Sequence, residues 1–163
     1  MGCIGDAVEE ALLKSLLAVG QRIPETSVFI SSGDALQKAD LLPACRLLAE
    51  NGYTIYATDG TCKYLCENGV PALKALWPSE EATSNRFPRA LDLIRDHKVD
   101  LVMNIPKNFT SNELTNGYKM RRAAIDYNVP LITNSRLASA FIKAFCTVPY
   151  EKISIKSWDE YKA

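Results

Sequence analysis

The chain has 163 residues, 47% of them hydrophobic and 23% charged, which is the size and composition of one globular domain with a short extension. Its 19 basic and 19 acidic residues cancel, so the sequence lacks the basic surface by which proteins bind nucleic acid or anionic membranes. No apolar run approaches the roughly 20 residues that cross a bilayer, and any anion must therefore be bound by a small local site.

The first 24 residues are predicted to contain one helix. Residues 6–19 carry apolar side chains at helical spacing, and Asp6 with Glu9 has the spacing of a capping pair. Gly20 and Pro24 end this helix. Residues 1–5 show no periodicity, so we expect the chain to be cut from a longer protein. The predicted inward stripe of the helix comprises Val8, Ala11, Leu12, Leu16 and Val19.

From residue 27 onward, strand and helix patterns alternate. Strands are predicted at 28–30, 53–57, 70–76, 100–104 and 129–132. Helices are predicted between them at 40–51, from the turn at 58–61 to 68, from 88 onward and at 116–127, with a last one from a Ser135 cap to 145. This alternation predicts a doubly wound α/β fold with a five-stranded parallel sheet and helices on both faces. Pro71 places the third strand at an edge, which suits the flavodoxin-like order 3-2-1-4-5.

Three local predictions complete the chain. Pro43 fits the helix at 40–51 only if it lies in the first turn. A long loop at 105–115 follows the fourth strand. The tail at 151–163, with Trp158 and Tyr161, is predicted to pack back onto the domain.

The stretch at 53–61, Y-T-I-Y-A-T-D-G-T, has the layout of an anion site. The first amides of a helix have no internal partners and carry the positive end of the helix dipole. Thr58 and Thr61 add two hydroxyls around Asp59 and Gly60. The alternative is that Thr58 or Asp59 merely caps the helix.

Ligands of open α/β sheets bind beyond the carboxyl ends of the strands. The polar and aromatic side chains predicted at this edge are Ser31, Ser32, Lys38, Thr58, Thr61, Trp77, Ser79, Asn104, Lys107, Asn108, Thr133 and Asn134. Such a set can hold an anionic small molecule, with the Trp77 indole as one wall.

The same edge is poor in catalytic groups. The only histidine, His97, is predicted at a helix end on the opposite side of the sheet, and Asp59 is the sole carboxylate at the centre. Of Arg121 and Arg122, at most one can face the site, because helical neighbours point about 100° apart. We expect this pair to serve ion pairing or domain contacts rather than a phosphate.

The five cysteines are odd in number and follow no secretory signal, which indicates a reducing cytoplasm. Cys62 and Cys66 share one face of a predicted helix, a spacing that can hold a metal. No histidine or second pair lies near them, so we expect them to pack and predict no metal site.

Five motifs, in this order and spacing, resemble the methylglyoxal-synthase-like (MGS-like) domain at the C-terminus of the carbamoyl-phosphate synthase large subunit. They are A-T-D-G-T at 57–61, W-P-S-E at 77–80, M-N-I-P at 103–106, Y-K-M-R-R-A-A-I-D at 118–126 and V-P-L-I-T-N at 129–134. Residues 5–20 resemble the end of the preceding synthetase domain. We therefore assign residues 1–24 to that end and a connecting helix, and residues 25–163 to the MGS-like domain.

The resemblance implies a regulatory role without catalysis in this fragment. In the family, upstream ATP-grasp halves use ATP with Mg or Mn to make carbamoyl phosphate for pyrimidine and arginine biosynthesis, and a separate subunit or domain cleaves glutamine. The implied partners are the rest of the large subunit, the glutaminase subunit, a small effector and a possible second copy of the chain. No cofactor is expected in this fragment, and the implied location is cytoplasmic.

The family's effectors are nucleotides, UMP or IMP, in one group and N-acetylglutamate in another. By resemblance, Lys38, Thr58, Thr61 and Asn104 fall where the family contacts the effector's phosphate or carboxylate. Trp77 favours the acetylglutamate type. Lys107 and the Asn116-Gly117 step depart from that type, and two lysines near the site favour a nucleotide.

Methylglyoxal synthase itself is the enzyme alternative, since it has the same fold and Thr-rich turn. That enzyme needs an Asp-bearing loop, where this chain reads W-P-S-E-E-A-T-S-N, and a His after the fourth strand, where it reads I-P-K-N-F-T. General acid-base catalysis needs both groups, so we expect no such activity. A stand-alone effector-binding module is the other alternative.

Overall fold

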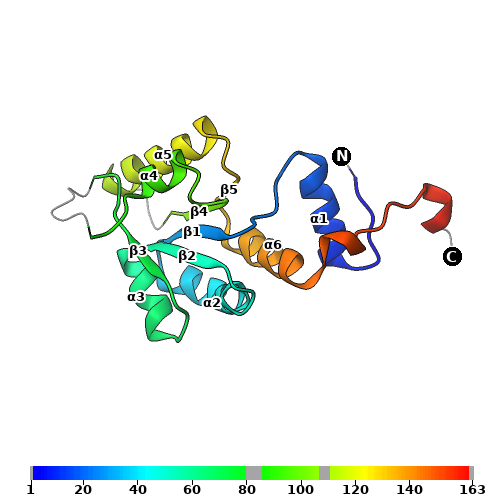
Figure 1. Cartoon of the computed structure of the whole chain (residues 1–163), viewed down its shortest axis with the longest axis horizontal. Coiled ribbons are helices and arrows are strands. Elements are labelled where there is room, and N and C mark those ends of the chain that lie inside the picture. The colour runs from blue at the N-terminus through cyan, green and yellow to red at the C-terminus, as the bar shows by residue number, and fades with distance from the viewer. Residues whose placement is uncertain (1, 80–85, 107–110, 162–163) are drawn as a thin grey trace.

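The computed structural model describes residues 2–79, 86–106 and 111–161. Its centre is a parallel five-stranded sheet in the order β3-β2-β1-β4-β5 (Figure 1). The strands are β1 (Ser27–Ser32), β2 (Thr54–Thr58), β3 (Leu73–Ala75), β4 (Leu101–Ile105) and β5 (Leu131–Ile132). The predicted fold class and strand order are confirmed, with the proline-containing third segment at the edge.

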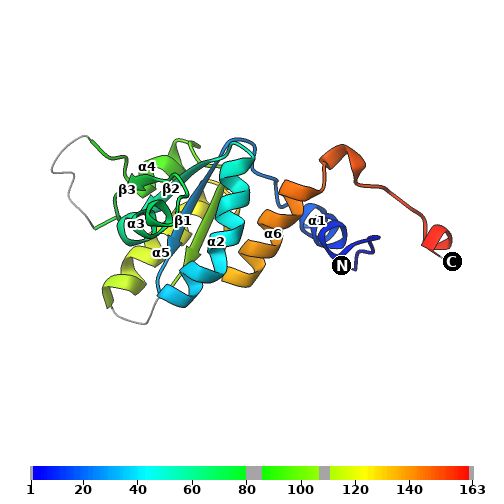
Figure 2. The ribbon, with the colours of Figure 1, turned by 90° about the horizontal axis from the view of Figure 1, so that it is seen from below.

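Helices cover both faces of the sheet (Figures 1 and 2). One face carries α2 (Ala35–Glu50), α3 (Asp59–Glu67) and α6 (Ser135–Thr147), and α1 (Val8–Ala18) packs outside α6. The other face carries α4 (Ala90–Arg95) and α5 (Ser111–Asp126). Two short 3-10 turns, Tyr150–Lys152 and Trp158–Tyr161, follow α6.

Period-two alternation along the buried strands divides the core into two clusters. In β1, Val28 and Ile30 pack toward α2 and α6, whereas Phe29 packs toward α4 and α5. In β4, Met103 joins the first cluster and Val102 the second. All five residues are fully buried. The side chains that end β1 and β4 are therefore held in fixed positions at one edge.

Two helices begin earlier than predicted. Asp34 caps α2 by accepting a 2.7 Å hydrogen bond from the Gln37 amide, so α2 starts at Ala35. Pro43 therefore lies inside the helix, and its predicted place in the first turn is wrong. Helix α5 starts at Ser111, which shortens the loop predicted at 105–115. At α6 the cap is Asn134 rather than Ser135, one residue before the predicted position.

The N-terminal helix exists as predicted, and its inward face matches the prediction in part, because Leu12 and Leu16 pack against the first core cluster. Leu13 is fully buried in the first core cluster, while Val8 and Val19 of the predicted stripe are 79% and 69% exposed. The predicted cap is also wrong, because the Asp6 amide donates to Glu10 (2.8 Å). Glu9 instead pairs with Lys143 of α6 at 2.6 Å.

The tail packs back onto the domain as predicted: Ile153 packs against the first core cluster, and polar side chains contact the N-terminal segment. Ser154 donates to the Glu10 carboxylate (3.2 Å), Lys14 lies 3.0 Å from the Tyr161 hydroxyl, and Lys156 pairs with Asp6 at 2.6 Å. Both chain ends consequently lie beyond α6, at the end of the molecule away from α3 (Figure 1). None of the described helices combines the length and apolar character needed to cross a membrane.

Candidate anion-binding site

The candidate site lies at the carboxyl ends of β1, β2 and β4. Strands β2 and β3 extend the sheet on one side of β1, and β4 and β5 extend it on the other. The β1/β4 boundary is therefore the switch point at which doubly wound sheets bind ligands. Ser31 and Ser32 of β1 are in register with Asn104 and Ile105 of β4, so polar side chains meet at this point.

Helix α3 starts directly after β2 with an open N-terminus. Thr58, in an extended conformation, occupies the N-cap position, and its side chain makes no capping hydrogen bond. The first amides of α3, from Asp59 to Thr61, have no partner within the helix and carry the positive end of its dipole. The alternative that Thr58 serves only as a cap is thus not supported.

The two threonine hydroxyls have different environments. Thr61 is 2% exposed, accepts from the Ser32 amide and donates to the Ser32 carbonyl, both at 3.1 Å. Its one hydroxyl proton is therefore engaged within the protein. Among the described residues, the Thr58 hydroxyl reaches only Ser31 Oγ at 3.5 Å and Thr61 Oγ1 at 3.4 Å, distances at the weak limit of hydrogen bonding. The Thr58 side chain is 3% exposed, so the two threonines differ in the strength of their hydrogen bonds and not in burial, and Thr58 has the weaker ones.

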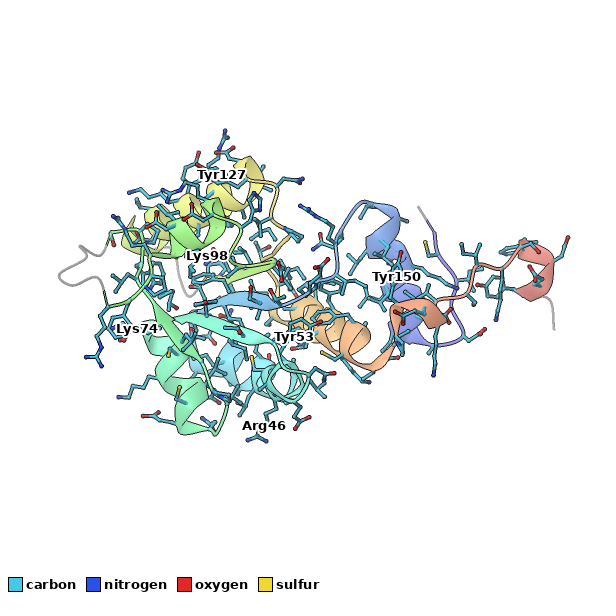
Figure 3. The ribbon with its side chains drawn as sticks, in the orientation of Figure 1. Arg46, Tyr53, Lys74, Lys98, Tyr127 and Tyr150 are labelled. Atoms are coloured by element: carbon cyan, nitrogen blue, oxygen red, sulfur yellow. The ribbon has the colours of Figure 1, made fainter. Side chains whose placement is uncertain are left out.

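Charge near the first turn is predominantly positive. Lys38 Nζ lies 3.6 Å from the position that a Cβ on Gly60 would take, which places the ammonium beside the α3 amides. The Asp59 carboxylate is neutralised by Lys74 of β3 at 2.6 Å, on the exposed side of the turn. Figure 3 shows Lys74 at this edge, beside α3 and β3. An anion at the α3 amides would therefore be attracted by Lys38, and the carboxylate at residue 59 would repel it little because that carboxylate is already paired.

Asn104 is the centre of the β4 side of the site. It is 1% exposed, and its Oδ1 accepts a 2.6 Å hydrogen bond from Arg121 Nη1. Its Nδ2, like the buried Ser32 hydroxyl, has no hydrogen-bond partner among the described residues. Buried polar atoms are nearly always paired, so these two atoms indicate a place that a ligand or water completes.

The remaining predicted residues are distributed unevenly. Trp77 follows β3, is half-buried and packs against the second core cluster. Asn116, which is 1% exposed, donates from Nδ2 to Ser79 at 2.8 Å and so joins α5 to the segment after β3. Lys107 and Asn108 lie outside the described residues, so their predicted contacts with the ligand are not tested.

Arg121 is the residue that the sequence reasoning missed. We expected ion pairing or domain contacts for both arginines; Arg122 does pair with Asp126 at 2.8 Å, but Arg121 bonds Asn104. A signal was available at Gly117, one turn earlier on α5. A Cβ there would lie 2.8 Å from Arg121 Nη1, so the glycine leaves room for the guanidinium.

The opposite edge of the sheet has its own cavity, of about 570 Å³. It is lined by His97, Arg22, Asp100 and Tyr150, among others. His97 is exposed and follows α4 directly after its C-cap, on the predicted side. Burial acts to raise the pKa of the Asp100 carboxyl, but the hydrogen bonds that it accepts from the amides of residues 25–27 and from the Thr26 hydroxyl together lower that pKa. These hydrogen bonds anchor the chain at the start of β1.

The cysteine pair lies on α3, four residues apart. The thiols of Cys62 and Cys66 both donate to the Ala72 carbonyl, at 3.4 and 3.7 Å. Partial burial raises the pKa of the Cys62 thiol to about 11, which disfavours the thiolate that metals bind. Within the described part of the chain, no group of three or more His, Cys, Asp or Glu side chains could hold a metal ion.

The sequence model of the MGS-like domain family matches residues 40–133. The multifunctional protein ura1 of Schizosaccharomyces pombe is 40% identical over 90% of this chain, an alignment that covers 7% of the relative. The multifunctional protein CAD of Squalus acanthias is 31% identical, and human mitochondrial carbamoyl-phosphate synthase (ammonia) is 32% identical, each over 99% of this chain but only 8% and 10% of the relative. The range 40–133 spans both threonines of the turn, Asn104 and Arg121. The chain belongs to the family of MGS-like domains found in carbamoyl-phosphate synthases.

Proposed function

We propose that the chain is an effector-binding regulatory domain that holds a small anion at the N-terminus of α3. The observation that carries this proposal is the convergence of uncapped helix amides, the weakly bonded Thr58 hydroxyl and Lys38 at one turn. Helix-terminal amides, a hydroxyl and a lysine are the donors that bind a phosphate or carboxylate.

Two effector classes fit this chemistry. The first is a nucleotide such as UMP or IMP, with its phosphate on the α3 amides and Lys38 and its base against Trp77. The second is N-acetylglutamate, with a carboxylate in the same place and the acyl group against the indole. The second lysine that favours a nucleotide, Lys107, lies outside the described residues, so that preference stays a prediction.

We further propose that the regulated activity is carbamoyl phosphate synthesis in a longer protein. The support is that one of the relatives bears that name and that the chain spans a tenth or less of each relative's length. The ATP- and Mg- or Mn-dependent chemistry and the glutaminase would belong to other parts of that protein or its partner subunit, and the product would enter pyrimidine or arginine biosynthesis. A cytoplasmic location is proposed because all five cysteines are free thiols.

Calorimetric titration of the chain with UMP, IMP and N-acetylglutamate tests the proposal. We expect at least one of them to bind, and Thr58→Val to weaken that binding by about tenfold or more, since a hydrogen bond to a charged group contributes about 1.5–3 kcal/mol. Thr147→Val is the matched control, because Thr147 is exposed at the far end of α6. Unchanged binding by Thr58→Val, or no binding by the parent chain, would refute the proposed site.

A further inference from the structure

The cavity at the amino ends of the strands is large enough for a small molecule. Its volume of about 570 Å³ lies within the roughly 300–1,000 Å³ of ligand pockets. One wall is the connection between α1 and β1, at residues 20–25, and the other is formed by residues 97, 99, 100 and 128–130, before β4 and β5. Figure 1 shows the connection running from α1 to the start of β1. A molecule in this cavity would therefore contact both the N-terminal segment and the domain that carries the sheet.

Hydrogen bonds within the protein hold the two walls of the cavity together. The Arg22 guanidinium donates to the Asn128 carbonyl, and the Asp100 carboxylate accepts from the amides of residues 25–27. These contacts anchor the connection at two points, on either side of residues 23 and 24. The cavity is therefore enclosed by anchored chain on both sides.

The lining of the cavity offers apolar surface and does not attract an anion. Its charged side chains are Arg22, Glu25 and Asp100, so carboxylates outnumber cations. Arg22 and Asp100 are also already bonded within the protein. This lining differs from the α3 turn, where Lys38 and the helix amides favour negative charge. The apolar lining residues are Leu17, Ile23, Pro24, Val99, Val129 and Pro130.

One side chain of the lining lacks a hydrogen-bond acceptor. Gln21 lines the cavity, and its Nε2 is buried without a partner among the described residues. Buried polar atoms are nearly always paired. The torsion that turns the amide group of a glutamine is soft, so Nε2 can turn toward an acceptor inside the cavity. A carbonyl oxygen on a bound molecule would supply the missing acceptor.

We propose that this cavity is a second ligand site, which takes a small uncharged molecule that combines an apolar ring with a carbonyl acceptor. The ring would contact the half-buried side chains of Leu17, Ile23 and Pro130, and the carbonyl would accept from Gln21 Nε2. The site is independent of the anion site, because the two lie at opposite edges of the sheet. A ligand here would link the connection after α1 to the starts of β4 and β5.

Three probes with the same benzene ring test the class of ligand. Benzamide has an uncharged carbonyl acceptor, benzylamine is a cation without an acceptor, and benzoate is an anion. In titrations followed by backbone-amide chemical shifts, benzamide should shift residues 21–23, 97, 99–100 and 128–129 and leave residues 59–61 unchanged. We expect benzamide to bind about two- to tenfold tighter than benzylamine, since that is the range for one neutral hydrogen bond. Benzoate should also bind more weakly, because the carboxylates of the lining repel it.

Substitution of Gln21 tests the role of its side-chain amide. Gln21→Leu should abolish the preference for benzamide over benzylamine and leave the affinity for benzylamine unchanged. Gln37→Leu is the matched control, because Gln37 is the other glutamine of the chain and lies in α2, outside the lining. If Gln21→Leu does not fold, Tyr150→Ala gives the second measurement, since Tyr150 lines the cavity but is 64% exposed. That variant should weaken benzamide binding at least about twofold, because it removes part of the wall.

Several results would overturn the inference. They are no benzamide shifts around the cavity, equal or tighter binding of benzylamine or benzoate, a preference that survives in folded Gln21→Leu, and unchanged benzamide affinity in Tyr150→Ala. None of these results depends on whether UMP or N-acetylglutamate binds at the α3 turn. The second site and the proposed function can therefore fail separately.

Discussion

Removing the Thr61 hydroxyl should destabilise the folded domain as well as take a polar group away from the site. Thr61→Val keeps the shape of the side chain but removes both 3.1 Å hydrogen bonds to the Ser32 backbone. Ser32 is 5% exposed, so its amide and carbonyl would be left buried without their partner, at about 1–3 kcal/mol each. We expect a total loss of about 2–6 kcal/mol, a large part of the roughly 5–15 kcal/mol that stabilises a domain.

Urea denaturation followed by circular dichroism measures this loss directly. Thr58→Val is the control, because it is the same substitution three residues away and removes only contacts of 3.4 and 3.5 Å. We expect that variant to lose less than about 1 kcal/mol. Equal losses in the two variants would contradict the assignment of Thr61 to structure and Thr58 to the ligand. The outcome shows whether weaker ligand binding by a Thr61 variant would reflect a less stable fold or a lost contact with the ligand.

Two further predictions concern the N-terminal helix. The Lys14 ammonium and the Asp6 amide hold the pKa of the Glu10 carboxyl at about 2, below its ordinary 4.5. The stabilisation from Glu10 is therefore complete above about pH 4.5 and is lost as the pH falls toward 2. Urea denaturation between these pH values should show a free energy of unfolding that falls with pH, and Glu10→Gln should reduce that slope. An unchanged slope in Glu10→Gln would contradict this prediction. Leu13→Ala should cost about 2–5 kcal/mol, because Leu13 is fully buried. Val8→Ala, at 79% exposure, should cost less than about 0.5 kcal/mol, and similar losses in both would mean that α1 does not pack as described.

The sheet was predictable because its signals are local. Buried parallel strands are short continuous apolar runs, and Pro71 marks the edge strand because proline cannot donate to a ladder. Pro43 misled the prediction of α2, since the rule that proline belongs in the first turn is weaker than the Asp34 cap together with packing against α6. Apolar spacing identified α1, but it could not show that the rest of the domain would pack against Leu13 rather than Val8.

The site was predictable only in part, for a similar reason. Thr58 and Lys38 could be placed because strand ends and helix starts fix their backbone positions. The assignment of Thr61 to structure and Thr58 to the ligand depends on which hydroxyl reaches the Ser32 backbone, and that distance cannot be derived from the sequence. Arg121 was missed because periodicity gives the direction of a residue from the helix axis but not the reach of a long side chain.

The most direct test of the central claim is a chemical-shift map of the backbone amides of the chain during titration with N-acetylglutamate and, separately, with UMP. An anion bound as proposed should shift the amides of residues 59–61 and Asn104 most strongly, since they belong to the α3 turn and the end of β4. The amides around the opposite cavity, at residues 20–23, 25, 97, 99–100 and 128–129, should stay unchanged. Shifts confined to that opposite cavity, with the α3 turn unaffected, would contradict the account.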